Sequence, residues 1–237
     1  QIIEEPCEVK VSCTVLKTNG VGDNLVEFTK FLATSDGILV KSPKFLKVMQ
    51  SKLKLLQRRL SRKKKHSKNY EKQRILVARV HHTIDNRRKD FHFKQAHALC
   101  DAGDMVFMED LDYRTLAKGM LGKHILDAGF GQFRTITKYV CWKRGKFFGE
   151  VSAKGTSQQC PECGVQVRKD LSVRVHRCEC GYLTDRDVAS GQIIRNRGIA
   201  LISTAGHVGI QNAYADGLPG IEMSQSRSKS KSRSFSH

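Results

Sequence analysis

Two closely spaced cysteine pairs constrain the fold of this chain more than any other feature of its sequence. "CPECG" supplies Cys160 and Cys163, and "CECG" supplies Cys178 and Cys180, with 14 residues between the pairs. Such pairs can fold as two knuckles that present four thiolates to a tetrahedral Zn²⁺ ion, each followed by a glycine for the tight turn. Disulfides or free thiols are the alternative. We expect a structural zinc ribbon over residues 156–183, with no open coordination position for chemistry.

The cysteines outside the cluster and the start of the chain bear on its setting. Cys7, Cys13, Cys100 and Cys141 are scattered along the sequence. No secretory signal precedes them, so a reducing compartment is expected. No apolar run approaches the length of a membrane span, and we expect no membrane partner. The chain starts at Gln1 with a strand-like alternation, and we interpret it as a fragment that lacks an N-terminal part.

Positive charge is concentrated in one stretch. The chain has 42 Lys and Arg against 23 Asp and Glu, a net charge of +19, and residues 41–94 alone hold 19 of these bases against three acids, a net +16. A field of this size favours polyphosphate partners through counterion release. A solvated surface helix is the alternative, but sixteen net charges of one sign argue against it. The predicted nucleic-acid contacts are Arg58, Arg59, Arg62, Lys63, Lys64, Lys65, Arg87, Arg88 and Lys89.

The same basic stretch has the pattern of two helices. Apolar residues recur at steps of three and four, which places on one stripe Leu46, Met49, Leu53, Leu56 and Leu60. "KKKHSKN" (63–69) interrupts the pattern, and a second helix is expected from about Glu71 to Leu99. The sequence therefore predicts a basic helical hairpin over residues 44–99, with its apolar seams facing each other and the body of the protein.

Short strands on both sides of the hairpin predict an α/β sheet of mixed direction. Residues 9–15 have the pattern of a strand, and residues 28–40 that of a β-hairpin with an Asp-Gly turn. "DMVFMEDL" (104–111) is typical of a buried strand and is followed by a loop with several glycines. A helix (132–145) and a strand (146–151) come next, and the last helix is expected to end near Gly198.

Two acids lie where metal-dependent hydrolysis would need them. Glu109 ends the predicted strand 104–111, and Asp187 begins the last helix. Each also has a simpler interpretation: Glu109 as an acid facing solvent, and Asp187 as a favourable charge in a first turn that Thr184 or Asp185 caps. Two-metal phosphodiester chemistry instead needs carboxylates from several elements around two Mg²⁺ ions. A third acid would then come from the first strand of the sheet.

Several segments together resemble the C-terminal half of the TnpB family, also called OrfB, insertion-sequence "transposases" ancestral to the type V CRISPR effectors. These segments are "FMEDL", "LGKHILDAGFGQFRTITKYVCWKRGKFF", "GTSQQCPECG" and "CGYLTDRDVASGQIIRNRG". "LQRRLSRKKKHSKN" and "NRRKDFHFK" are similar to the family's helical insertion. The resemblance covers about residues 20–200. It implies an RNase H-like (RuvC) nuclease with a mixed sheet, a helical-hairpin insertion and an inserted zinc ribbon.

The resemblance also implies the catalytic carboxylates. Glu109 matches the family's second carboxylate and Asp187 its third, while Asp185 is not expected to be a ligand. The family's Gly-hydrophobic-Asp-hydrophobic-Gly motif is replaced by "GVGDNLVEFTKFLATSDG", one residue longer and without the second glycine. Asp23 is the only nearby aspartate upstream of the predicted hairpin, and we assign it as the first carboxylate. A slip of one residue turns a strand side chain to the opposite face, so activity depends on this stretch.

The expected function follows from the resemblance: binding of guide RNA and target DNA, with cleavage of DNA by two Mg²⁺ or Mn²⁺ ions, next to a structural Zn²⁺. No small-molecule substrate is expected, and the implied location is cytoplasmic and nucleoid-associated in a prokaryote. The alternative is a nuclease-inactive, truncated nucleic-acid-binding derivative; a free-standing zinc-ribbon module ranks last because it does not explain "FMEDL". The expected domains are an N-terminal β remnant (1–18), a RuvC-like core (19–155), the ribbon (156–183), the last RuvC helix (184–200) and a disordered basic tail (201–237).

Overall fold

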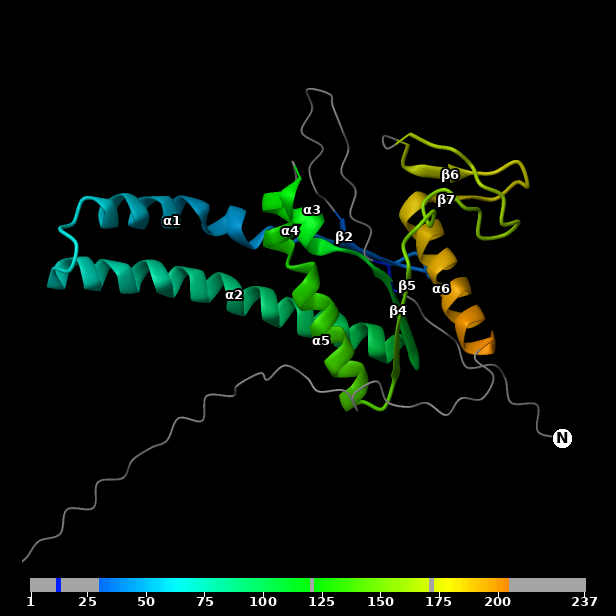
Figure 1. The fold of residues 1–237 in the computed structure, drawn as a ribbon, viewed down its shortest axis with the longest axis horizontal. Helices are drawn as coiled ribbons and strands as arrows, with labels where there is room; N and C mark the ends of the chain where they lie inside the picture. Colours follow the sequence, from blue (N-terminus) through cyan, green and yellow to red (C-terminus); the bar gives the residue numbers. More distant parts are fainter. Residues whose placement is uncertain (1–11, 14–29, 120–121, 171–172, 205–237) are drawn as a thin grey trace, which may run out of the picture. The chain divides into compact units, whose positions relative to one another are not determined.

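Short strands form the centre of the structure, a computed structural model that describes residues 12–13, 30–119, 122–170 and 173–204. β1 (Ser12–Cys13), β2 (Lys30–Thr34) and β3 (Leu39–Lys41) pair in that order as antiparallel strands. β4 (Met105–Asp110) pairs in parallel with β5 (Phe147–Ser152), and β1 lies against β4. The predicted mixed α/β class is confirmed, in the form of small sheets surrounded by helices (Figure 1).

The predicted β-hairpin at residues 28–40 is confirmed over its described part. β2 and β3 are joined by a turn in which Gly37 has a φ of 89°, a left-handed conformation that glycine adopts without strain. Between Lys30 and Leu32 the pairing shifts by one residue, as at a β-bulge. β1 covers part of the strand predicted at 9–15, whose other residues lie outside the described ranges.

The predicted helical hairpin is confirmed. α1 (Phe45–Ser61) and α2 (Lys68–Ala102) lie side by side and extend away from the strands (Figure 1). The seam between them is apolar and consists of Leu53, Val80 and Ile84, with Phe45, Leu46, Met49, Leu56 and Val77 packed against these three. The Ser67 hydroxyl accepts a hydrogen bond from the Tyr70 N–H at 3.1 Å and caps α2. No helix in the described ranges is both long and apolar enough to cross a membrane.

The loop predicted after β4 is in part wrong, because it contains helices. α3 (Tyr113–Lys118) and α4 (Gly122–Ala128) precede α5 (Phe130–Lys143). Gly122 begins α4 where a Cβ atom would lie 2.0 Å from the carbonyl oxygen of Ala117, so this glycine permits close packing and does not mark a loop. Asp127 of α4 accepts the N–H of Leu46 at 2.8 Å and thereby satisfies the start of α1.

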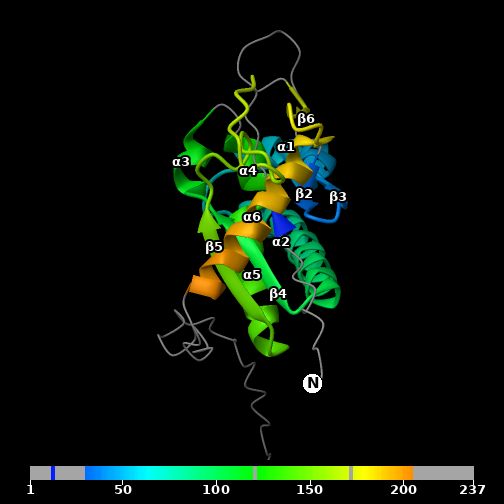
Figure 2. The same ribbon diagram turned by 90° about the vertical axis from the view of Figure 1, so that its right-hand side faces the viewer.

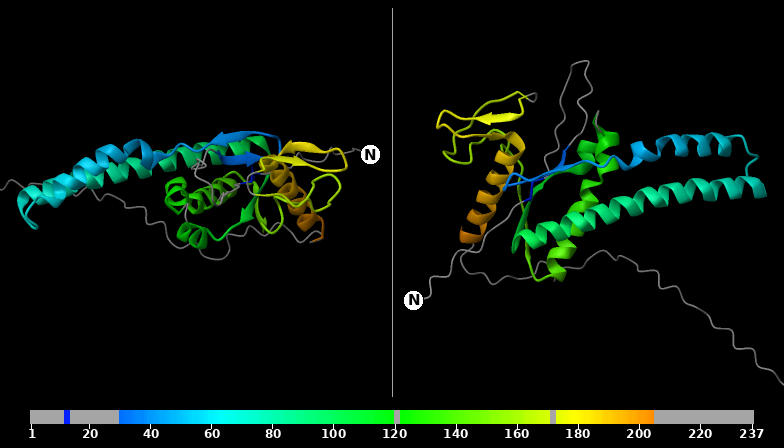
Figure 3. Two further views of the ribbon diagram at one scale, coloured as in Figure 1. Left: turned by 90° about the horizontal axis from the view of Figure 1, so that it is seen from above. Right: turned by 180° about the vertical axis from the view of Figure 1, so that it is seen from behind.

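α2 and α5 cover one face of the strands and form the larger core with them (Figure 3). This core contains Phe31, Leu32, Ala96, Leu99, Cys100, Val106, Met108, Ile125, Ala128, Phe130, Phe133, Ile136, Val140 and Cys141. The helix predicted at 132–145 is confirmed, although it begins two residues earlier, and its Phe133, Ile136 and Val140 are buried. These three residues are three and four positions apart, so they form one stripe of the helix.

α6 (Arg186–Thr204) covers the other face and contacts β1, β2, β4 and β5 (Figure 2). Ile194 of α6 is buried against Phe107 and Val151 in a second, smaller core. The predicted end of this helix near Gly198 is wrong, since the helix continues to Thr204. Gly198 lies where α6 crosses the Phe107 ring, and a Cβ atom there would come within 2.5 Å of ring atoms. Here glycine serves packing, not termination.

His92 in the larger core gives a pH-dependent prediction. It is fully buried, its Nε2 lies 2.9 Å from the Ala128 carbonyl, and it stacks on Phe31. Burial lowers the pKa of His92 from 6.5 to about 4. As the pH falls below 6.5 the unfolded chain takes up this proton first, so the free energy of unfolding should fall between pH 6.5 and 4 by about 3 kcal/mol from this group alone.

Urea unfolding at several pH values measures this effect. His92→Gln should remove the corresponding part of the pH dependence, whereas the same exchange at the exposed His81 is the matched control. Equal pH dependence in the wild type and His92→Gln would contradict the prediction.

Candidate carboxylate and metal sites

β4 directs its side chains alternately to the two cores. Val106 and Met108 lie in the core beneath α2 and α5. Phe107 packs instead with Ile194 of α6. Glu109 is two residues beyond Phe107, so strand alternation places it on the α6 face. β4 and β5 are parallel and end at the edge of the sheet next to which α6 begins (Figure 2), and Glu109 is the last residue but one of β4.

Glu109 is buried and held by a hydroxyl group. Only 5% of the residue is exposed, and Oγ1 of Thr156 donates a hydrogen bond to its Oε1 at 2.6 Å. Thr156 is itself buried and belongs to the loop between β5 and the first cysteine pair. A buried carboxylate is costly unless hydrogen bonds, a countercharge or a metal ion compensate it. The interpretation of Glu109 as an acid facing solvent is therefore wrong.

Asp185 and Asp187 lie where β7 (Leu183–Asp185) continues into α6. Oδ1 of Asp185 accepts the N–H of Asp187 at 2.8 Å, which confirms Asp185 as a helix cap. Asp187 is 4% exposed. Nζ of Lys30 lies 2.8 Å from Oδ2 of Asp185 and 3.2 Å from Oδ2 of Asp187. Burial lowers the pKa of Lys30, but the hydrogen bonds and charges of both aspartates outweigh it and hold this pKa above its ordinary value.

The described residues bring buried oxygen ligands to this end of the sheet without completing a carboxylate metal site. Within the described ranges, no His, Cys, Asp or Glu set other than the cysteine cluster brings three ligand atoms close enough to share one ion. Asp23 lies outside those ranges, so its assignment as the first carboxylate stays a prediction. The buried carboxylates of Glu109 and Asp187 are the hard donors that Mg²⁺ and Mn²⁺ prefer, so the donor chemistry fits such ions.

The four clustered cysteines form a second candidate metal site. Their Sγ atoms all lie within 4.8 Å of one another, with 3.7 Å between Cys160 and Cys180 and 3.5 Å between Cys163 and Cys178. A tetrahedral zinc site separates its sulfurs by roughly 3.8 Å, whereas a disulfide bond is about 2.05 Å long. The cluster can therefore hold one metal ion such as zinc, and its geometry argues against the disulfide interpretation.

The turns around the cysteines have the local structure that a knuckle requires. Gly164 and Gly181 have φ values of 76° and 90°, and their N–H groups donate to the carbonyls of Cys160 and Cys178 at 3.0 and 3.1 Å. The expectation that glycine closes each tight turn is thus confirmed. A hydrogen bond from the N–H of Cys180 is the main cause that lowers the pKa of Cys178, to about 7. The lower pKa favours the thiolate form, which binds metal.

His176 is buried inside the ribbon and does not lie on its surface. The sequence predicts that His176 is not a zinc ligand, because four thiolates already complete the site. It predicts a surface residue or a nucleic-acid contact instead. It is instead fully buried in β6 (Val175–Arg177), within hydrogen-bonding reach of Lys169 and against the Tyr182 ring at 6.1 Å. The surface interpretation of His176 is therefore wrong. The ring fills the interior of a ribbon that has few other large side chains.

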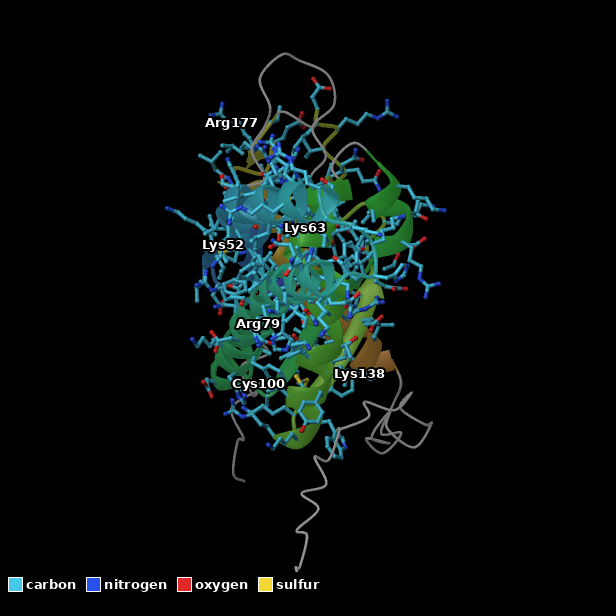
Figure 4. All side chains as sticks on the ribbon, turned by 90° about the vertical axis from the view of Figure 1, so that its left-hand side faces the viewer. Lys52, Lys63, Arg79, Cys100, Lys138 and Arg177 are labelled. Carbon is cyan, nitrogen blue, oxygen red and sulfur yellow. The ribbon has the colours of Figure 1, made fainter. Side chains whose placement is uncertain are left out.

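The predicted nucleic-acid contacts mostly surround the helical hairpin as exposed side chains. Figure 4 views the hairpin end-on, with nitrogen-tipped side chains such as Lys52, Lys63 and Arg79 projecting around α1 and α2. Arg88 differs, because its Nε donates to the carbonyl of Asp127 at 2.8 Å and its side chain is mostly buried. Arg88 therefore ties α2 to α4. The other predicted contacts are exposed, and their role stays a prediction.

Two residues of the carboxylate site were not found from the sequence. Lys30 and Thr156 are single polar residues without a spacing pattern, and their partners are 155 and 47 residues away along the chain. Only the fold brings such partners together. "GTSQQC" belongs to a segment that resembles the family, which was the one available signal for Thr156.

Comparisons with known proteins agree with this architecture. A family model described as a probable transposase (OrfB_IS605) matches residues 27–120, and one described as a Cas12f1-like TNB domain matches residues 130–194. A putative RNA-guided DNA endonuclease of Streptomyces pristinaespiralis is 34% identical over 197 residues, which cover 82% of this chain and 49% of that protein. The putative RNA-guided DNA endonuclease InsQ of Escherichia coli (strain K12) is 31% identical over 193 residues, 73% of this chain and 48% of that protein.

The solved structures show the same fold. Cas12f1, solved in complex with sgRNA and target DNA, superimposes with a TM-score of 0.54 at 14% identity, over 80% of this chain and 50% of that chain. The chain thus has an α/β fold like that of part of Cas12f1, with a helical hairpin and a cysteine cluster. The chain belongs to the TnpB/OrfB family, as its sequence motifs predicted. It spans about half the length of the curated relatives that it matches.

Proposed function

We propose that this chain provides the RuvC-type nuclease part of a TnpB-like protein, which binds guide RNA and cleaves DNA in the prokaryotic cytoplasm in association with the nucleoid. The observation that carries the proposal is the burial of two acids from different elements, Glu109 of β4 and Asp187 of α6, at one end of the sheet. Buried acids at a strand end and a helix start are what two-metal phosphodiester hydrolysis requires. The relatives' names and the Cas12f1 complex support the choice of substrate.

In this proposal, Glu109, Asp187 and Asp23 would hold two Mg²⁺ or Mn²⁺ ions, which would supply an activated water and stabilisation of the leaving oxygen of the DNA phosphodiester. Thr156 orients Glu109 through its hydrogen bond at 2.6 Å, and the cap by Asp185 fixes the first turn of α6 on which Asp187 lies. Glu109 and Asp187 are thereby held in place before DNA arrives.

The other parts bind nucleic acid. The exposed bases of the helical hairpin, without Arg88, would contact phosphates of a guide–target duplex. A structural Zn²⁺ in the cysteine cluster would fix the ribbon, whose Arg174 accepts a hydrogen bond at 2.8 Å from the N–H of Arg186, the first residue of α6. The ribbon is thus positioned to guide a strand toward Asp187.

A nuclease-inactive nucleic-acid-binding derivative is the second candidate. It is favoured by the ion pair of Lys30 with Asp187. It is also favoured because, within the described ranges, no three acids at this site lie close enough to share one ion. This candidate keeps the basic hairpin and the ribbon and needs no divalent ion at the sheet.

Calorimetric titration of the zinc-loaded protein with Mn²⁺ separates the two candidates. The nuclease proposal predicts Mn²⁺ binding that Glu109→Gln and Asp187→Asn each weaken at least about tenfold, since each removes one charged ligand. Asp110→Asn is the matched control, because Asp110 is the next residue of β4 and its side chain is 67% exposed. If the wild type and Glu109→Gln give equal heats of Mn²⁺ binding, the nuclease proposal is wrong and the nuclease-inactive binding protein is the better candidate.

A further inference from the structure

Lys30 holds an unusual position for a lysine in a sheet. It is the first residue of β2, and its ammonium group contacts the Oδ2 atoms of Asp185 and Asp187 at 2.8 and 3.2 Å. These two acids come from the junction of β7 and α6, 155 and 157 residues further along the chain. One positive charge of the chain therefore lies between two carboxylates, one of which is the proposed third metal ligand.

The local structure keeps this ammonium in place. The shift in pairing between Lys30 and Leu32 lies at the next residue, Phe31, whose ring is buried in the core beneath α2 and α5. Bulges of this kind redirect neighbouring side chains, and they are frequent beside active sites. The Lys30 side chain is only 29% exposed, so its stem is packed while its charged end reaches the aspartates.

The charges explain why a cation is needed there. Asp187 is almost fully buried, and Asp185 uses its other oxygen, Oδ1, to cap α6. Two carboxylates this close repel each other, and leaving a buried carboxylate without compensation is strongly destabilising. The ammonium group of Lys30 contacts both and lowers that cost, in addition to the charge of Arg186, the residue between them.

We propose that Lys30 is the built-in counterion of the third catalytic carboxylate: it neutralises Asp187 and Asp185 while no divalent ion is bound, and a divalent ion that binds Asp187 must displace it. This inference rests on the proposed nuclease site. Lys30 is thus a positioning residue that sets how tightly the site binds metal. In the metal-free protein it keeps the carboxylates in place, and its displacement lowers the affinity for Mg²⁺ or Mn²⁺.

This role predicts in which direction the affinity for metal changes when the charge of Lys30 is removed. Removing the ammonium group while keeping an apolar stem, as in Lys30→Met, should lower the Mn²⁺ dissociation constant roughly tenfold, which corresponds to the loss of one competing charge. A lysine that merely supports the strand would show the opposite, since its loss would misplace Asp187 and weaken binding. Lys41→Met is the matched control, because Lys41 is the direct partner of Lys30 across β2 and β3 and is exposed.

Mn²⁺ binding is measured by calorimetry on the zinc-loaded protein, and circular dichroism verifies that each variant is folded. Tighter binding in Lys30→Met than in the wild type and Lys41→Met, abolished by adding Asp187→Asn, supports the inference. Unchanged or weaker binding in Lys30→Met overturns it. Lys30→Gln, which keeps a polar end without the charge, replaces Lys30→Met if that variant does not fold.

A second measurement uses the wild type. Amine-reactive labelling followed by mass spectrometry reports how accessible Lys30 is. Labelling of Lys30 should increase several-fold when Mn²⁺ is added, with Lys41 as the internal reference. Equal labelling of Lys30 with and without Mn²⁺, under conditions where calorimetry shows binding, overturns the inference.

Failure of the inference differs from failure of the proposed function. If wild-type binding depends on Glu109 and Asp187 but is unchanged in Lys30→Met, the nuclease site stands and the inference is wrong. If only Lys30→Met binds Mn²⁺ through these acids, the inference is supported, and the wild-type chain is the binding protein with its site blocked by Lys30. If neither protein binds Mn²⁺ through these acids, both are wrong.

Discussion

Removing the metal ion from the cysteine cluster, or replacing Cys160 by serine, is expected to unfold the ribbon while leaving the helical hairpin folded. The ribbon has little else to hold it together: β6 and β7 have three residues each, and its described interior consists mainly of Cys160, Cys178 and His176. Structural zinc contributes about 10–16 kcal/mol of binding energy to the folding of zinc-finger peptides. No apolar core of this size could replace that contribution.

Zinc content and hydrogen exchange test this expectation. The wild type should contain one zinc ion per chain and Cys160→Ser none, and peptides from residues 153–170 and 173–185 should lose their protection, whereas α2 should keep its own. Cys100→Ala is the matched control, since Cys100 is a buried cysteine in α2, outside the cluster, and its loss should leave the zinc content unchanged. If the ribbon stays protected from exchange without metal, the packing of the thiols alone holds it together and the expectation is wrong.

Unfolding of the ribbon should also disturb the carboxylate site. Thr156, which holds Glu109, lies four residues before Cys160, and Arg197 of α6 donates to the carbonyls of Ser152 and Lys154 in the same loop. The loop is therefore fixed to α6 at one end and to the metal cluster at the other. This arrangement gives a physical reason for placing a cysteine ribbon directly before the helix that bears Asp187.

The elements that were predicted correctly from the sequence have strong local patterns. The apolar residues of α1 and α5 repeat with the period of a helix, and β4 is a continuous apolar run, as expected for a strand buried on both faces. The cysteine spacing predicted a cluster for the same reason, because four ligands of one ion must lie together wherever the chain leads. Such signals are local in sequence, so a single chain contains them in full.

The wrong predictions concern residues whose role depends on a distant partner. Gly198 has the sequence signal of a helix end, yet its role is set by the Phe107 ring across the interface between α6 and β4. His176 has the signal of a surface residue, yet it fills the ribbon interior. Lys30 showed no signal at all, because the carboxylates that it contacts are more than 150 residues away. Sequence patterns do not encode such contacts.

Phe31→Ala is expected to cause a large loss of stability, because it removes the ring around which the larger core packs. The Phe31 ring is 1% exposed and lies between the rings of Phe91, Phe130 and Phe133, with centroid distances of 5.0 to 5.1 Å. It connects β2 to α2 and α5 at the place where the strand pairing shifts. Truncating a buried phenylalanine costs about 3–5 kcal/mol, through lost burial and the cavity that remains.

That cost is a large share of the roughly 5–15 kcal/mol by which domains are usually stable, so Phe31→Ala should unfold at a much lower urea concentration with an unchanged slope. Phe93→Ala is the matched control, because Phe93 is 37% exposed and its truncation should cost only about 1–2 kcal/mol. A cost below about 1.5 kcal/mol for Phe31→Ala would mean that the surrounding rings collapse into the cavity.

The same substitution should also affect Lys30, which precedes Phe31. Loosening the ring frees the ammonium group from Asp187, so a folded Phe31→Ala protein should show increased amine labelling of Lys30 without added Mn²⁺.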